Sequence, residues 1–197
     1  MIKKLSYIFG SKTKVQEIVL LLHNAKEVVR QGFYQHELEK IEKFCEENGI
    51  HLVKSEFKVL ISDEETGNYS NKGIRIDKKD KREGMYFVYL SKSEQKALLA
   101  AYYELINNDK DLGRLLGYPQ CCVEFFCNNF SEDNTNPKLT PTNLFTNISK
   151  REEDNVLISH FPCSSDCIRS VKIGKKNLEI IASVDGSRAR ELFNSLN

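Results

Sequence analysis

The sequence lacks the long apolar runs of a membrane-spanning protein and the charge excess of a nucleic-acid-binding protein. Its longest apolar stretches, such as 18–22 and 97–103, are far shorter than the ~20 residues that a bilayer-spanning helix needs. Lys and Arg number 29 against 28 for Asp and Glu, so the net charge of +1 favours neither a phosphate backbone nor an acidic membrane as partner. Because the N-terminal segment also lacks a signal-peptide pattern, we expect a cytoplasmic location.

Several catalytic signatures are missing as well. The chain contains no glycine-rich phosphate loop, no nucleophile elbow and no His-Glu-x-x-His sequence, which argues against nucleotide hydrolysis, serine esterase chemistry and zincin proteolysis. It also lacks the third cysteine, at two-residue spacing, of radical S-adenosylmethionine enzymes. These absences leave open both the reaction and the question of whether the protein is an enzyme.

The apolar pattern that is present predicts an α+β fold. Apolar residues at three- and four-residue steps predict a helix over 12–31 and a second helix over about 34–48, and the two would form an antiparallel hairpin. The period then changes to two. Three strands are expected around 57–61, 74–76 and 85–90, and their polar connections suit an antiparallel meander.

The second half of the chain is predicted to be mostly helical. Ser91 and Glu94 form a capping box that opens an apolar helix, a short helix follows at 111–116, and another runs over about 119–130. Residues 131–143 form a polar loop with two prolines, which makes this segment the best candidate for mobility.

A final helix is expected from about residue 168 to the end, and Gly174 and Gly186 are positions where it could break. Taken together, the patterns divide the chain into a helical hairpin with a small antiparallel sheet, 1–90, and a helical Cys-rich region, 91–197. The two could also form one continuous domain.

The cysteines are clustered. Five of the six lie between Cys121 and Cys167, and in an intracellular protein such clustering more often signals metal binding or thiol chemistry than disulfides. Cys45 and Cys127 fall on apolar stripes, so we expect both to be core cysteines. The four that remain are the candidates for chemistry: Cys121, Cys122, Cys163 and Cys167.

The sequence His160-x-x-Cys163-x-x-x-Cys167 has the spacing of a metal site. If residues 164 onward are helical, Cys163 and Cys167 share one helix face, with His160 on the turn upstream. One thiolate from Cys121 or Cys122 would complete a tetrahedral Cys3His centre, with zinc slightly preferred over an iron–sulfur cluster. Adjacent helix positions project about 100° apart, so only one of this pair is expected to bind a given zinc ion.

The spare thiol could ligate a second iron, act as a nucleophile or form a strained disulfide with its neighbour. A proline precedes each cysteine group at an expected helix start, where unpaired N–H groups favour anions. Cys121, Cys122 and Cys163 are therefore expected to be biased toward the thiolate. Other side chains nearby could hold a carboxylate or orient a ligand: Arg114, Glu124, Asp166, Arg169 and Ser170.

Two other functions are open. In a metal-free thiol enzyme, Cys122 or Cys163 would be the nucleophile, His160 its base and another cysteine the resolving thiol. In a binding module, the basic loop from Lys78 to Arg82 would contact RNA or a protein while the cysteines stabilise the fold. Acidic residues interrupt this loop, which favours a solvated surface instead.

Two cysteine-bearing segments, LGRLLGYPQCCVEFF and HFPCSSDCIRS, lie about forty residues apart. In these segments, within residues 111–170, the chain resembles a family of uncharacterised prokaryotic proteins, well represented in methanogenic archaea, that is classed as a domain of unknown function. The resemblance implies one site formed by the four cysteines and implies no particular activity.

Overall fold

The structure is a computed structural model that describes residues 1–63, 68–130 and 143–196. The chain forms two compact units, and each is described by itself. The sheet unit comprises residues 27–116 and 127–137, and the cysteine unit comprises residues 1–26, 117–126 and 138–197. The loop at 131–143, expected to be mobile, lies outside the described residues except for Asn143. A domain boundary near residue 90 stays a prediction.

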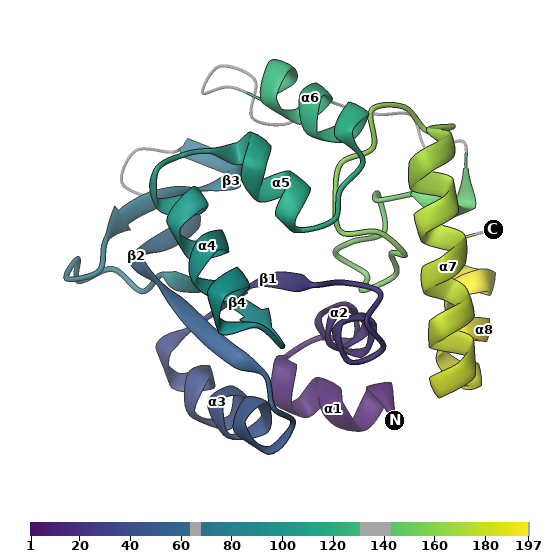
Figure 1. Cartoon of the computed structure of the whole chain (residues 1–197), viewed down its shortest axis with the longest axis horizontal. Coiled ribbons are helices and arrows are strands. Elements are labelled where there is room, and N and C mark those ends of the chain that lie inside the picture. Colours follow the sequence, from purple (N-terminus) through teal and green to yellow (C-terminus); the bar gives the residue numbers. More distant parts are fainter. Residues whose placement is uncertain (64–67, 131–142, 197) are drawn as a thin grey trace. The chain divides into compact units, whose positions relative to one another are not determined.

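The sheet unit contains a four-stranded antiparallel sheet, and this confirms the predicted fold class of mixed helices and antiparallel strands (Figure 1). The strand order is β1-β4-β2-β3. The strands are β1 (Val28–Phe33), β2 (His51–Asp63), β3 (Asn68–Asp77) and β4 (Met85–Ser91). The expected three-strand meander is therefore corrected in two ways: a fourth strand is present, and β4 pairs with β1 and β2 rather than with β3.

Strand β1 lies where the sequence pattern predicted the end of a long helix. The helix stops at Leu22, and Asn24 adopts a left-handed conformation with φ 57°. Val28 and Val29 are fully buried, and their β-branched side chains suit a strand. A run of apolar residues as short as this fits both the helical and the strand period, so the pattern alone could not locate the change.

Three α-helices accompany the sheet: α3 (Leu38–Glu47), α4 (Glu94–Leu105) and α5 (Asp109–Leu115). The N-cap of α4 is Ser93 rather than Ser91, since the Ser93 hydroxyl accepts from the N–H of Lys96. Helix α4 packs on one face of the sheet through the buried Ala97 and Ala100. Small side chains allow this close approach.

A buried carboxylate fixes the C-terminal end of α4 to the strands. Glu104 is 4% exposed and forms ion pairs with Arg30 of β1 and Arg75 of β3. The two guanidinium groups also lie over aromatic rings, Arg30 at 3.5 Å from the centroid of Phe87 and Arg75 at 4.3 Å from that of Phe57. A buried carboxylate needs such partners because an unpaired charge in the interior is costly.

The cysteine unit is helical in its described part. Its N-terminal hairpin consists of α1 (Ile2–Phe9) and α2 (Lys12–Leu22), so a helical hairpin is present. Its arm α2 lies within the first predicted helix, whereas the other arm is α1 and not the helix predicted over about 34–48, which corresponds to α3. The other elements are α6 (Gln120–Asn129), which starts in this unit, a 3-10 turn at Leu144–Thr146, α7 (Ile168–Val184) and α8 (Gly186–Leu196). Within the described ranges, no helix is both long and apolar enough to cross a membrane.

Polar side chains fix the segment 154–158, which leads into the cysteine loop. Gln16 of α2 donates to the carbonyl of Val156 at 3.0 Å, and Asn177 of α7 donates to that of Leu157 at 2.7 Å. The carboxylate of Asp154 accepts from the N–H groups of Lys12 and Thr13 and so caps α2. These bonds determine where the chain enters the loop.

Helix α7 continues through Gly174, one of the two positions at which a break was expected. A side chain at Gly174 would collide with the main chain of the 3-10 turn, since a Cβ atom built there lies 2.5 Å from the carbonyl oxygen of Phe145. Gly174 is therefore required by packing. The other expected break, at Gly186, is confirmed: α7 ends at Val184 with Asp185 as its C-cap, and α8 starts at Gly186.

We predict that Gly174→Ala destabilises the protein by about 1–3 kcal/mol, because the added methyl group must displace main-chain atoms. The measurement is urea unfolding followed by circular dichroism. Gly186→Ala is the matched control, because no atom lies within 4 Å of its built Cβ. Equal stability of the two variants would contradict the packing role of Gly174.

Candidate metal centre

Cys121 and Cys122 lie in the first turn of α6. The chain enters this helix through Gly117, which has φ 78°, and Pro119, whose carbonyl accepts from the N–H groups of Cys122 and Val123. The helix start after Pro119 agrees with the prediction. This turn fixes the backbone of both cysteines at one helix end.

Cys163 and Cys167 lie on the loop before α7, so the final helix begins near residue 168 as expected, and the condition for a shared helix face, helical structure from residue 164, is not met. Helix α7 begins at Ile168 with Cys167 as its N-cap residue. Between the two cysteines the chain forms a turn in which the N–H of Cys167 donates to the carbonyl of Ser164 at 3.1 Å. A turn, rather than helical spacing, therefore brings these two thiols together.

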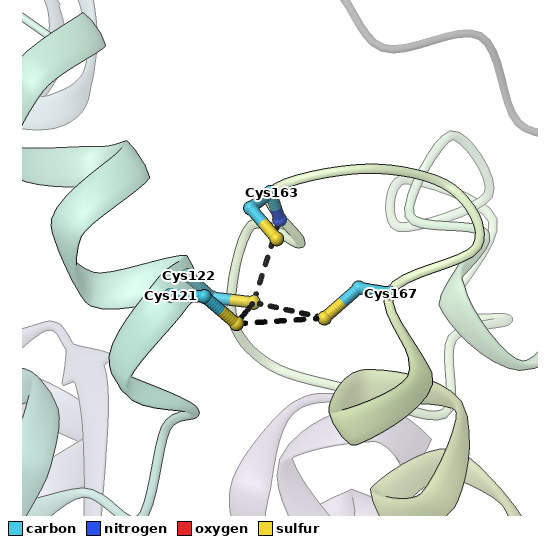
Figure 2. A group of neighbouring side chains, drawn as sticks. All are labelled: Cys121, Cys122, Cys163 and Cys167. Carbon is cyan, nitrogen blue, oxygen red and sulfur yellow. Dashed lines mark hydrogen bonds between the residues drawn. The ribbon is translucent and has the colours of Figure 1, made fainter.

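The four sulfur atoms converge in one small volume (Figure 2). All lie within 4.8 Å of one another. The Sγ atoms of Cys121 and Cys122 are 3.9 Å apart, and Cys167 Sγ lies 3.7 Å from the first and 3.6 Å from the second. These four cysteines could hold a metal ion, and the sulfur atoms of both members of the adjacent pair lie within the group, although only one of the pair was expected to bind a given zinc ion.

The group has an inner and an outer side. Cys122 and Cys167 are buried, at 2% and 8% exposed, whereas Cys121 and Cys163 are partly exposed. Cys122 Sγ accepts from the N–H of Cys163 at 3.4 Å and lies 3.2 Å from the hydroxyl oxygen of Ser170. Main-chain and hydroxyl donors of this kind stabilise negative charge on a sulfur.

His160 lies outside the group of four. Its Nε2 shares a hydrogen bond of 2.8 Å with Ser170 Oγ, so Ser170 joins it to Cys122. The imidazole is 5% exposed, and its centroid lies 5.1 Å from that of Tyr118. Burial, with the positive charges of Lys26 and Arg151, lowers the pKa of His160 to about 3.

A buried ion pair fixes the residue before His160. Lys26 pairs with Glu17 and donates to Ser159 Oγ at 2.7 Å, and its ammonium group lies 5.4 Å from the ring centroid of Tyr118. Sequence reasoning missed this pair and the role of Tyr118. Lys26 and Ser159 are far apart in the sequence, and no local pattern links them. Tyr118, by contrast, lies in the Gly-Tyr-Pro segment directly before the cysteine pair, and this position could have identified it as a site residue.

The thiols differ in acidity, and not in the predicted order. Burial raises the pKa of Cys122, and burial together with the thiols of Cys167 and Cys121 raises that of Cys163 to about 11. Burial also opposes ionisation of Cys167, but the hydroxyl and N–H of Ser170 and the neighbouring thiols lower its pKa to about 6. The expected thiolate bias is thus reversed at Cys122 and Cys163.

Other candidates lie apart from the group. Cys45 is buried as expected, and burial raises its pKa to about 12, but Cys127 is exposed rather than in the core. Three of the flanking polar residues bind elsewhere: Arg114 to Asp111, Glu124 to Gln120 and Asp166 to Asn143. Of that set, Ser170 is the residue that contacts a sulfur atom.

Two of the four basic residues of the loop from Lys78 to Arg82 form ion pairs. Lys78 pairs with Glu56 at 2.5 Å and Arg82 with Asp80 at 2.7 Å. Lys58 donates to two carbonyl groups of the loop and so fixes its conformation. This is the arrangement of a solvated, self-paired loop.

In comparisons with known proteins, residues 96–192 match the model of a family described as a protein of unknown function (DUF483). The match includes all four clustered cysteines, His160 and Ser170. No match was found among curated proteins or among solved structures.

We predict that His160 adds to stability at neutral pH and less in acid. The pKa of His160 in the folded chain lies below its ordinary value of 6.5, so on acidification the unfolded chain binds the proton at a higher pH than the folded chain does. The contribution of His160 to the free energy of unfolding is therefore fully present above about pH 6.5 and is lost as the pH falls toward about 3. Urea unfolding of wild type and His160→Gln between pH 7 and 4 measures it. The stability difference between them should narrow in acid; a constant difference would contradict the buried neutral imidazole.

Proposed function

We propose that the protein is a metal-binding protein in which Cys121, Cys122, Cys163 and Cys167 hold one zinc ion. The proposal rests on the convergence of four thiol groups in the described structure. It replaces the Cys3His set suggested by the sequence, since His160 bonds to Ser170 and the second cysteine of the adjacent pair supplies the fourth sulfur.

The sulfur spacing carries the proposal. With zinc–sulfur bonds of ~2.3 Å, tetrahedral geometry places the sulfur atoms ~3.8 Å apart. The observed separations of 3.6, 3.7 and 3.9 Å scatter about that value. Three of the thiols are therefore separated by close to the edge lengths that a single ion requires, and the fourth, that of Cys163, lies within 4.8 Å of them.

The same spacing favours one ion over a cluster. In a [4Fe–4S] cluster each cysteine binds a different iron, and in a [2Fe–2S] cluster two cysteines bind each iron, so the sulfur ligands must be farther apart than around one ion. Tetrahedral thiolate sites suit zinc. Iron–sulfur chemistry is accordingly the second choice.

Four protein ligands leave no open coordination position, which is typical of structural zinc sites. The ion would join the start of α6 to the loop before α7. The donors around Cys122 fit this role, since they would hold a thiolate in place. Reduced thiols also suit the cytoplasmic location that the sequence predicts.

The metal-free thiol enzyme is less well supported. The pKa is raised at both proposed nucleophiles, Cys122 and Cys163, and His160 bonds to Ser170. A nucleophilic cysteine instead needs a lowered pKa or a base beside it, together with access to the substrate, and Cys167, whose pKa is lowered to about 6, is buried.

We predict about one zinc ion per chain in protein purified without an affinity tag under anaerobic conditions. The double variant Cys163→Ser, Cys167→Ser should lose it, because two of the four ligands are removed. Elemental analysis with an absorption spectrum makes the measurement. Cys127→Ser is the matched control, since this cysteine is exposed and outside the group, and it should retain the metal.

Three results would count against the proposal. Stoichiometric iron with a visible charge-transfer band would show that the metal is iron and not zinc. Metal-free but stably folded wild type would remove the centre altogether. Loss of metal from Cys127→Ser would show that the four clustered cysteines are not the ligand set.

We also predict that Ser170→Ala weakens metal binding about 10–100-fold, the usual effect of losing a partner of a metal ligand. The hydroxyl that contacts both Cys122 and His160 is lost in this variant, whereas Ser170→Thr keeps it. Competition with a chromogenic chelator gives the affinities, and Co²⁺ spectra check that the ligand set is unchanged. Equal affinities for Ala, Thr and wild type would refute the role of Ser170.

A further inference from the structure

Helix α4 has an apolar face that no other part of the described structure covers. Five large apolar side chains on or next to this helix are between 36% and 55% exposed: Leu98, Leu99, Tyr102, Leu105 and Ile106. Monomeric proteins seldom expose so many large apolar groups together, and patches of this kind mark interaction sites.

The orientation of the helix explains the exposure. The side toward the sheet consists of Ala97, Ala100 and Glu104, and the Glu104 carboxylate is bound by two arginines. These contacts fix the rotation of α4 about its axis. The leucine side must then point outward, so the apolar face is built into the fold rather than produced by a loose helix.

The spacing of the exposed residues is symmetric about Tyr102. Leu99 and Leu105 lie three positions before and after it, and Leu98 and Ile106 lie four positions before and after it. When two identical helices pack antiparallel across a two-fold axis, position 102 − n of one faces position 102 + n of the other. Each apolar residue would therefore meet an apolar residue.

We propose that this face binds the same face of a second copy of the chain, with the two α4 helices antiparallel and Tyr102 near the two-fold axis. Such an interface is isologous and must be self-complementary, as the symmetric pattern is. The exposed apolar stretch of α4 carries no charge: Glu94 and Lys96 lie in the first turn, and Glu104 is buried toward the sheet. Antiparallel packing places these first turns at opposite ends of the contact and aligns the helix dipoles favourably.

The size of the face sets the strength of association. Five half-exposed side chains offer a few hundred Å² per copy, less than the ~800 Å² per partner of a standard interface. The dimer is therefore weak, with a dissociation constant on the order of micromolar or above, and forms as the protein concentration rises.

The test is sedimentation velocity of the full chain over a concentration series. Wild type should shift from monomer to dimer, and Leu98→Glu and Ile106→Lys should each stay monomeric, because each buries an unpaired charge twice in its own dimer. Ile61→Glu, an exposed apolar position on β2, is the matched control and should dimerise like wild type. Circular dichroism melting checks that each variant is folded.

An equimolar mixture of the two α4 variants tests the orientation. In the antiparallel mixed dimer, Glu at position 98 of one copy faces Lys at position 106 of the other, while the second pair remains Ile106 against Leu98. The mixture should therefore regain dimerisation. Monomeric wild type at every concentration, dimers of folded Leu98→Glu, or a mixture that stays monomeric would each overturn the proposal.

Discussion

Four sulfur atoms within a few ångströms of one another are the constraint on which the cysteine unit depends. Thiolates at such distances repel one another, and burial disfavours their charge as well, so without a cation most of the thiols must stay protonated; burial first and the neighbouring thiols second raise the pKa of Cys122 and of Cys163. A bound ion reverses this preference, because its charge offsets the repulsion and the thiols release their protons. The surrounding bonds, from Ser170, His160 and the Lys26–Glu17 pair, hold the loop where the sulfur atoms can meet.

The sequence was sufficient to identify the four cysteines as one group, since their clustering and the paired proline-cysteine segments are local signals. It was insufficient for their geometry. Adjacent helix positions project about 100° apart, which predicted that Cys121 and Cys122 would not bind the same ion. Two side chains in the first turn of a helix can nevertheless rotate toward a common point, and these two sulfur atoms lie 3.9 Å apart. Helical spacing likewise misjudged Cys163 and Cys167, which a turn brings together. Acidity could not be predicted because burial outweighs the helix-end effect at Cys122.

The fold, too, could be predicted from local sequence patterns only in part. Period and propensity predicted mixed helices and antiparallel strands, but the first part of β1 was assigned to a helix because Val29 also continues the helical stripe. In α4 the apolar residues were correctly placed on a helix, yet the side that faces the sheet holds alanines and a glutamate. Pairing of Glu104 with arginines from β1 and β3 decides this, and those partners are 74 and 29 residues away in the chain. No local pattern contains that information.

The cysteine unit is discontinuous in sequence, and this has a consequence for the order of its assembly. Residues 27–116 lie between its first and second stretches and form most of the sheet unit. The N–H of Thr13, in the first turn of α2, donates to the carboxylate of Asp154, 141 positions later. The first two helices therefore lack this partner until nearly the whole chain has been synthesised. Long loop closures of this kind are slow, whereas the sheet unit can fold from an almost continuous stretch. Both halves of the thiol group exist only once Cys167 has been synthesised, so the proposed metal centre can assemble only late in the synthesis of the chain.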